Sequence, residues 1–175
     1  RGNSEGARPT SGDVSLTENV FADNASWPIN LSNIRGWPLL RDNSGSGYGT
    51  DGILFNSFNG DATLRADAGF PFVSSGGVVG PSETLVVEAG VVVKFNSGSR
   101  YLDIFGTLDV QGTAAEPVVF TSIQDDSVGG DTNGDGPSEG VPGQWRSLWF
   151  RADAVGTLRH AILRFRPLRH LQHDV

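Results

Sequence analysis

The sequence contains no cysteine, so disulfides contribute nothing to its stability. This absence excludes a small disulfide-dense scaffold but does not exclude export. Methionine is absent too, and the chain begins at Arg1, so we expect a processed protein or a piece of a longer one. No apolar stretch is long enough to span a bilayer, so we expect no membrane insertion. The sequence contains no charged-then-apolar leader, so we expect that any signal peptide has been removed.

Lysine is nearly absent as well: Lys94 is the only lysine among thirteen lysine and arginine residues, and the net charge is −7. Residues 1–155 carry nineteen acids and nine bases, whereas residues 156–175 carry four arginines and one aspartate. The three histidines, His160, His170 and His173, also lie in this second part. Because an acidic body repels nucleic acid and anionic membranes, we expect neither as a partner.

Similar residues return at a spacing of about 23, which is typical of one coil of a solenoid. Leu85 and Leu108 occupy matching places in the segments TLVVEAG and TLDVQGT. Phe72, Phe95 and Phe120 each lie in or at the end of a short apolar run. The repeat predicts that Leu85 stacks on Leu108 and that the three phenylalanines form an internal ladder.

Short segments of alternating apolar and polar residues predict strands with one buried face. We expect strands on both sides of bends at Ala89–Gly90 and Phe105–Gly106, and another after Pro117. The 24 glycines and the weak helical periodicity argue against long helices. A β-sandwich and a parallel β-solenoid both fit such strands, and the repeat of about 23 residues favours the solenoid.

Four segments carry a resemblance to a known family: SETLVVEAGVVVKF, GTLDVQGTAAEPVVFTS, DDSVGGDTNGDG and PGQWRSLWF with GTLRHAILRF. In this order they resemble the right-handed parallel β-helix modules of large bacterial exported proteins, which share the pectate-lyase-like fold. The resemblance is specific over residues 82–165, weaker over 13–72 and absent from Arg166 onward. It implies an all-β, right-handed parallel β-helix at the cell surface or outside the cell.

The resemblance also suggests a division of the chain. Residues 1–12 are expected to be a disordered or linking segment, residues 13–165 the β-helix with an inserted acidic loop at 124–143, and residues 166–175 an irregular basic tail. The order of the segments suggests a unit cut from a longer solenoid or a tandem array. Uncapped coils expose backbone N–H and C=O groups, so we expect head-to-tail self-association or contact with neighbouring repeats. The expected role is structural, in a filament, a matrix or adhesion.

The segment DDSVGGDTNGDGPSEG, residues 125–140, contains four aspartates and five glycines. Within it, DTNGDG places oxygens at alternate positions followed by a glycine, which is how a calcium loop of the EF-hand type begins. The twelfth position is Pro142 instead of glutamate, so an irregular, structural Ca²⁺ loop is expected, with a solvated turn as the alternative. The predicted metal ligands are Asp125, Asp126, Asp131, Asn133 and Asp135.

The fold also raises an enzymatic alternative, because pectate lyases and polygalacturonases share it, although fold alone does not establish chemistry. The acids Asp103, Asp109 and Asp153 form no convergent set in the sequence, so we predict that the chain is not an enzyme. A polysaccharide-binding β-helix, or a lyase or hydrolase, remains the alternative. Trp145 and Trp149, which follow the acidic loop, are candidates for stacking on a sugar, with core packing as the other interpretation.

Overall fold

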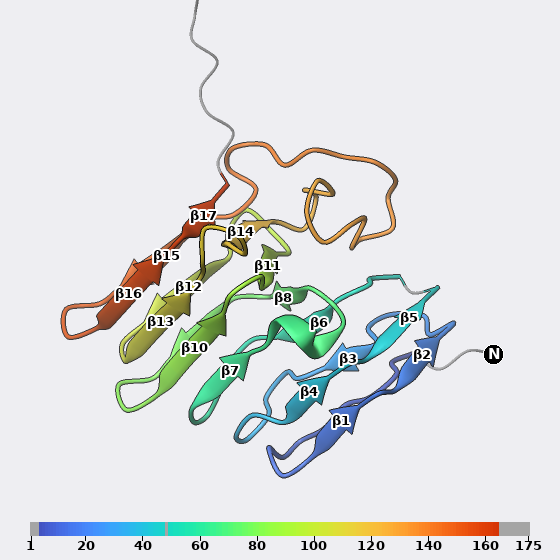
Figure 1. Ribbon diagram of the computed structural model, residues 1–175, viewed down its shortest axis with the longest axis horizontal. Coiled ribbons are helices and arrows are strands. Elements are labelled where there is room, and N and C mark those ends of the chain that lie inside the picture. The colour runs from blue at the N-terminus through green and yellow to red at the C-terminus, as the bar shows by residue number, and fades with distance from the viewer. Residues whose placement is uncertain (1–3, 48, 165–175) are drawn as a thin grey trace, which may run out of the picture.

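The computed structural model describes residues 4–47 and 49–164, and it is an all-β structure in which every pair of strands is parallel (Figure 1). The single helix among these residues is a short 3₁₀ turn, η1 (Ala66–Ala68), and no helix there is long and apolar enough to cross a membrane. The all-β prediction is therefore confirmed. The predicted basic tail, residues 166–175, lies outside the described residues.

The strands form three larger sheets and two pairs. The six-stranded sheet contains β3 (Ile29–Asn30), β6 (Ile53–Phe55), β8 (Phe72–Ser74), β11 (Val92–Phe95), β14 (Val118–Ser122) and β17 (Ala161–Leu163). The four-stranded sheet contains β7 (Ala62–Leu64), β10 (Thr84–Glu88), β13 (Thr107–Gln111) and β16 (Val155–Arg159). The three-stranded sheet contains β9 (Gly77–Val79), β12 (Tyr101–Ile104) and β15 (Ser147–Phe150). The two pairs are β1 (Ser15–Thr17) with β4 (Leu39–Arg41) and β2 (Val20–Ala22) with β5 (Ser44–Ser46).

From β9 onward the chain visits the three larger sheets in a fixed order, and we call each pass a circuit. The circuits are β9–β11, β12–β14 and β15–β17, and each strand of the middle circuit pairs with the matching strands of the circuits before and after it. The bends lie where the sequence predicts them, since residues 89–91 separate β10 from β11 and residues 105–106 separate β12 from β13. Glycine suits the first bend because Gly90 has a φ of 80°, in the left-handed region.

The register confirms one predicted stack and corrects the other. Leu85 pairs with Leu108, as expected. In the six-stranded sheet, however, Phe72 pairs with Val93 and Val93 with Phe120, so Phe95 lies two residues further along. The predicted phenylalanine ladder is therefore wrong, because the turns between strands differ in length. Alternation of side chains between the two faces fixes the register, and a constant spacing in sequence does not.

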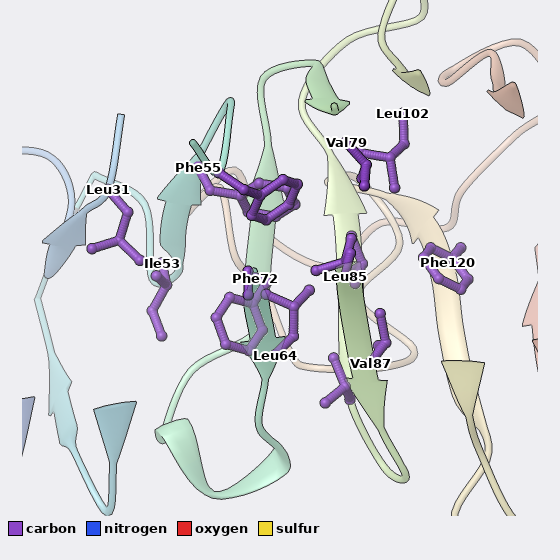
Figure 2. Close-up of a cluster of buried hydrophobic side chains, with 14 of the residues drawn as sticks. Leu31, Ile53, Phe55, Leu64, Phe72, Val79, Leu85, Val87, Leu102 and Phe120 are labelled. Carbon is purple, nitrogen blue, oxygen red and sulfur yellow. The ribbon is translucent and has the colours of Figure 1, made fainter. Parts of the chain in front are cut away.

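The core lies between the sheets and is filled by aliphatic and phenylalanine side chains from successive strands (Figure 2). Phe72 and Phe95 are both fully buried in it despite their different registers. Trp37 packs against Phe55, Phe58 and Phe72 with ring centroids 5.4–6.3 Å apart. Such a continuous core over many short strands is typical of structures whose successive repeats cover one another.

Backbone pairing extends upstream of residue 13, where the sequence places a linking segment. The Ala7 N–H donates to Pro28 O at 2.9 Å, and the Asn30 N–H donates back to Ala7 O at 2.8 Å. The Gly12 N–H donates to Arg35 O at 2.6 Å. Residues 6–12 therefore lie alongside residues 27–37 instead of apart from the sheets.

Candidate metal centre and an open aromatic face

The acidic loop leaves β14 after Ser122 and rejoins the sheets at β15, and it folds over the outer face of the six-stranded sheet (Figure 1). Lys94 Nζ donates to Gly130 O at 2.6 Å, which fixes the loop over β11. Further along, the Asp51 N–H, just before β6, donates to Thr132 O at 2.7 Å. The loop therefore reaches from β14 across β11 and β8 to the start of β6.

Close packing under the loop depends on glycine at two places. Gly129 has a φ of 67°, and a Cβ there would lie 3.3 Å from both Lys94 Cε and Pro71 Cβ. A Cβ at Gly52 would lie 3.2 Å from Thr132 Cγ2. Thr132 is itself buried. The loop is thus packed on the sheet, although most of its residues are polar.

Three predicted ligands come together in this loop. Asp126, Asp131 and Asp135 each offer a carboxylate oxygen, and these oxygens lie within 4.8 Å of one another. The Gly134 and Gly136 N–H groups donate to the two oxygens of Asp131 at 2.8 and 3.0 Å. Both glycines have positive φ, which allows the chain to turn around Asp131.

Two oxygens beside this cluster are buried without a donor. Asp126 Oδ2 accepts from the Ser138 N–H at 2.6 Å, but Asp126 Oδ1 has no hydrogen-bond partner among the described residues. Asn133 Nδ2 donates to Asp135 Oδ2 at 2.8 Å, and Asn133 Oδ1 has no partner there either. A buried oxygen without a donor is costly, and a hard cation bound by oxygens would satisfy both. The residues present therefore fit a metal such as Ca²⁺.

Asp125 takes a different position from the other four predicted ligands. Its carboxylate is buried and accepts from Thr121 Oγ1 at 2.6 Å and from the Ser127 hydroxyl, while Arg164 Nη1 lies 3.5 Å away. Burial by itself raises the pKa of Asp125, but the hydroxyls of Ser127 and Thr121 and the charge of Arg164 together hold that pKa below its ordinary value. Asp125 anchors the start of the loop to β14 and lies outside the three-carboxylate cluster.

Lys94 is a residue of this site that sequence reasoning missed. Its neighbours Val93 and Phe95 point into the core, so Lys94 points to the outer face, where the loop buries it completely. Burial lowers the pKa of Lys94, and the carboxylates of Asp126, Asp125 and Asp131 oppose this shift. Its only sequence signal is that it is the single lysine of the chain.

The two candidate tryptophans have different surroundings. Trp145 is buried and stacks on Phe95, with ring centroids 4.6 Å apart and planes 3° from parallel, and its indole N–H donates to Arg164 O at 3.3 Å. Trp145 is therefore a core residue, which corrects its assignment as a sugar-stacking candidate. Trp149 is 40% exposed on the outer face of the three-stranded sheet.

We call the surroundings of Trp149 the aromatic face: Tyr101, Asp103, Arg146, Trp149 and Arg151. Tyr101 and Trp149 meet edge to face at 5.6 Å, and the Arg146 guanidinium lies 5.8 Å from each ring centroid. The Arg151 guanidinium lies 3.7 Å from the Trp149 centroid, and its Nη2 donates to Asp103 Oδ2 at 2.6 Å. The hydrogen bond from Arg151 to Asp103 raises the pKa of Arg151.

Next to the aromatic face, between β9 and β12, lies a groove of about 500 Å³. Its lining is mostly polar and comprises Asn56, Ser75, Gly76, Gly77, Val78, Ser99, Arg100, Tyr101 and Asp103. This grouping has no signal in the sequence, because its members come from different circuits and only the register brings them together.

The acids considered for catalysis are dispersed. Asp103 lies on β12, whereas Asp109 lies on β13 in another sheet and accepts from Gln111 Nε2 at 2.8 Å. Asp103 is the one carboxylate in the described lining of the groove, and it is ion-paired with Arg151. Asp153 lies between β15 and β16.

Comparison with protein-family models, with curated proteins and with solved structures found no match to this chain. The functional inference therefore depends on the geometry of the acidic loop, of the aromatic face and of the last circuit.

Proposed function

We propose that this chain is a right-handed parallel β-helix module of an extracellular or cell-surface protein, with a structural role in self-association or adhesion. The fixed order of sheets, the parallel register and the shared core support this architecture. They agree with the resemblance of residues 82–165 to modules of exported proteins.

The observation that carries the associative role is the exposure of the last circuit. Ile104, Val110 and Phe120 are fully buried. Their register partners one circuit later, Phe150, Leu158 and Leu163, are 36–41% exposed. No strand among the described residues pairs with the outer edges of β15, β16 and β17. An apolar surface with free strand edges favours contact with a further coil.

The charges at the two ends of the described chain favour a second copy of this chain as the source of that coil. Residues 4–23 carry four acids and one arginine. Residues 144–164 carry four arginines and one aspartate. Opposite charges steer such ends together, and a head-to-tail contact that does not close on itself produces a filament.

Ca²⁺ is the proposed structural ion of the acidic loop, bound by Asp126, Asp131, Asn133 and Asp135. Support comes from the three close carboxylates and the two buried oxygens without donors. The ion would hold the loop against β11, β8 and β6, where Lys94 and Thr132 already anchor it. Weak affinity suffices outside the cell, because extracellular calcium modules bind with dissociation constants of about 10⁻⁴–10⁻³ M.

The proposed role involves no catalytic step. Action on a polysaccharide by a glycosidase requires a pair of carboxylates at a defined separation. The described groove lining contains Asp103 alone, and Arg151 neutralises it. A lack of paired carboxylates argues against catalysis in the groove but not against binding of a ligand there.

Calorimetric titration with Ca²⁺ tests the metal proposal. We expect heat of binding for the native chain and its loss in Asp131→Asn, while Asp109→Asn, on the distant β13, keeps it. Equal binding by the native chain and both variants would contradict the proposed site.

Electron microscopy of the purified protein in calcium and then in EDTA tests the associative role. We expect filaments whose axial repeat is a multiple of about 4.8 Å, the spacing of neighbouring strands. Leu158→Glu should disperse them. Dispersed particles of the native chain in both solutions would contradict self-association and favour a further coil of a longer chain, or adhesion.

A further inference from the structure

Arg146 of the aromatic face and Arg100 of the adjoining groove carry positive charge that no acid among the described residues neutralises. Among the described residues, the guanidiniums of Arg100 and Arg146 make no ion pair, although the chain has a net charge of −7. The Arg146 N–H donates to Arg100 O at 2.8 Å, so the two residues are neighbours on adjacent circuits. Two adjacent unpaired cations on an acidic protein form a local site for anionic groups.

The groove beside them has room for a ligand because residue 76 is a glycine. Gly76 has a φ of 95°, and a Cβ there would lie 3.4 Å from Arg100 Cδ. The next glycine, Gly77, instead allows close packing in the core, since a Cβ there would lie 3.0 Å from Cδ1 of the buried Leu102. Gly76 thus leaves space beside Arg100 in the groove.

The aromatic part of this face is held in place before any ligand arrives. Arg151 is fixed by two hydrogen bonds to Asp103, and it lies over the Trp149 ring. Trp149 in turn touches Tyr101 edge to face. Because their neighbours already order these rings, stacking of a ligand on their exposed surface costs less side-chain conformational entropy.

We infer that the aromatic face and its groove bind an anionic glycan, whose carboxylate or sulfate groups pair with Arg100 and Arg146 while a sugar ring packs on Trp149 and Tyr101. Guanidinium is suited to both anions because its planar donors pair with two oxygens at once. The C–H groups of a sugar ring suit the part of the Trp149 indole that Arg151 leaves exposed.

Charge density favours a glycan over a nucleic acid. Duplex DNA carries one negative charge for about every 1.7 Å of its axis, and the acidic remainder of this surface would repel it. A glycan with one acidic group on each sugar needs only the two cations present. The inference does not rest on the proposed head-to-tail contact, since the site uses outward side chains of β12 and β15, whereas that contact uses the free edge of β15 and its apolar Phe150.

The test uses three polymers with one backbone: dextran, carboxymethyl dextran and dextran sulfate, with poly-glutamate as a peptide control. Binding to the native chain is measured by biolayer interferometry over a series of salt concentrations. We expect at least tenfold tighter binding of an anionic dextran than of dextran or poly-glutamate. The two anionic dextrans distinguish a carboxylated from a sulfated ligand.

Variants locate the site. Arg100→Gln with Arg146→Gln should weaken binding of the anionic dextran at least tenfold and reduce its salt dependence, whereas Arg159→Gln, an exposed arginine on β16, should not. Trp149→Ala should weaken binding about tenfold at unchanged salt dependence, and Trp149→Phe should restore part of it. Equal binding of poly-glutamate, equal loss in Arg159→Gln, or no binding of any dextran would overturn the inference.

Discussion

The outer faces of the six-stranded and three-stranded sheets belong to the same circuits but differ in what covers them. On the first, the acidic loop buries Lys94 completely and brings three carboxylates close together above it. On the second, no loop among the described residues covers Trp149, which stays 40% exposed beside Arg151, and no acid there pairs with Arg100 or Arg146. On the first face the loop pairs with Lys94 but leaves clustered carboxylates that fit a cation, whereas on the second face two arginines have no ion pair among the described residues.

This difference shows how one repetitive architecture can carry two roles. Side chains on the outer face of a strand do not pack in the core, so the fold accepts a lysine on the six-stranded sheet and a tryptophan on the three-stranded sheet. The acidic loop, inserted between β14 and β15, then buries some of these outward side chains and makes them part of the packed structure. We call the loop-covered face of the six-stranded sheet the closed face and the uncovered face of the three-stranded sheet the open face. We therefore expect substitutions on the closed face to alter stability and substitutions on the open face to alter ligand binding.

The largest contrast is expected between the two tryptophans. Trp145→Ala removes a buried ring stacked on Phe95 and should reduce the free energy of unfolding by about 3–5 kcal/mol. Trp149→Ala removes a partly exposed ring and should cost less than about 1 kcal/mol. Urea denaturation of both variants gives the two values. Similar losses would contradict the assignment of the two rings to different roles.

The next effect is expected at the buried lysine. Lys94→Met keeps most of the side-chain volume but leaves Gly130 O without its donor and the carboxylates without their cation, so we expect a loss of about 2–3 kcal/mol. Calcium should reduce this loss, because the ion supplies part of the missing positive charge. Denaturation of the variant in calcium and in EDTA measures both effects, and an unchanged stability in EDTA would contradict them.

Acid should act on the closed face through Asp125. Its pKa in the folded protein lies below the ordinary 3.8 of the unfolded chain, so its stabilising contribution is present above about pH 4 and is lost as the pH falls through the folded value. Asp125→Asn should cost about 1–2 kcal/mol at pH 7 and flatten the loss of stability below pH 4. Thermal unfolding between pH 2 and pH 7 tests this, and parallel curves for the two proteins would contradict it.

The smallest effect on stability is expected for Arg146→Gln. This exposed guanidinium contacts two ring faces but makes no ion pair in the described part of the chain, so the free energy of unfolding should change by less than about 0.5 kcal/mol. A melting temperature close to that of the native chain is the expected result. A large decrease would mean that Arg146 supports the fold and is not kept for a ligand.

Alternation and bends were enough to predict the strands around residues 84–122, because glycine and the period of two dictate where short strands begin and end. The register of Phe95 was not predictable, since turns of different length shift residues relative to the repeat. DTNGDG indicated Asp131, Asn133 and Asp135 through the local spacing of oxygens, and the preceding acidic pair added Asp126. Lys94 and the aromatic face depend on contacts between residues far apart in sequence, which no local pattern carries.

The most direct test of the account is hydrogen–deuterium exchange of the native chain with calcium and with EDTA. The account predicts that calcium slows exchange in residues 123–143 and at residues 51–53, where the loop meets β6, and leaves residues 76–79 and 99–104 of the open face unchanged. Equal exchange in both solutions, or an equal change on both faces, would contradict the claim that a cation holds the acidic loop on the closed face.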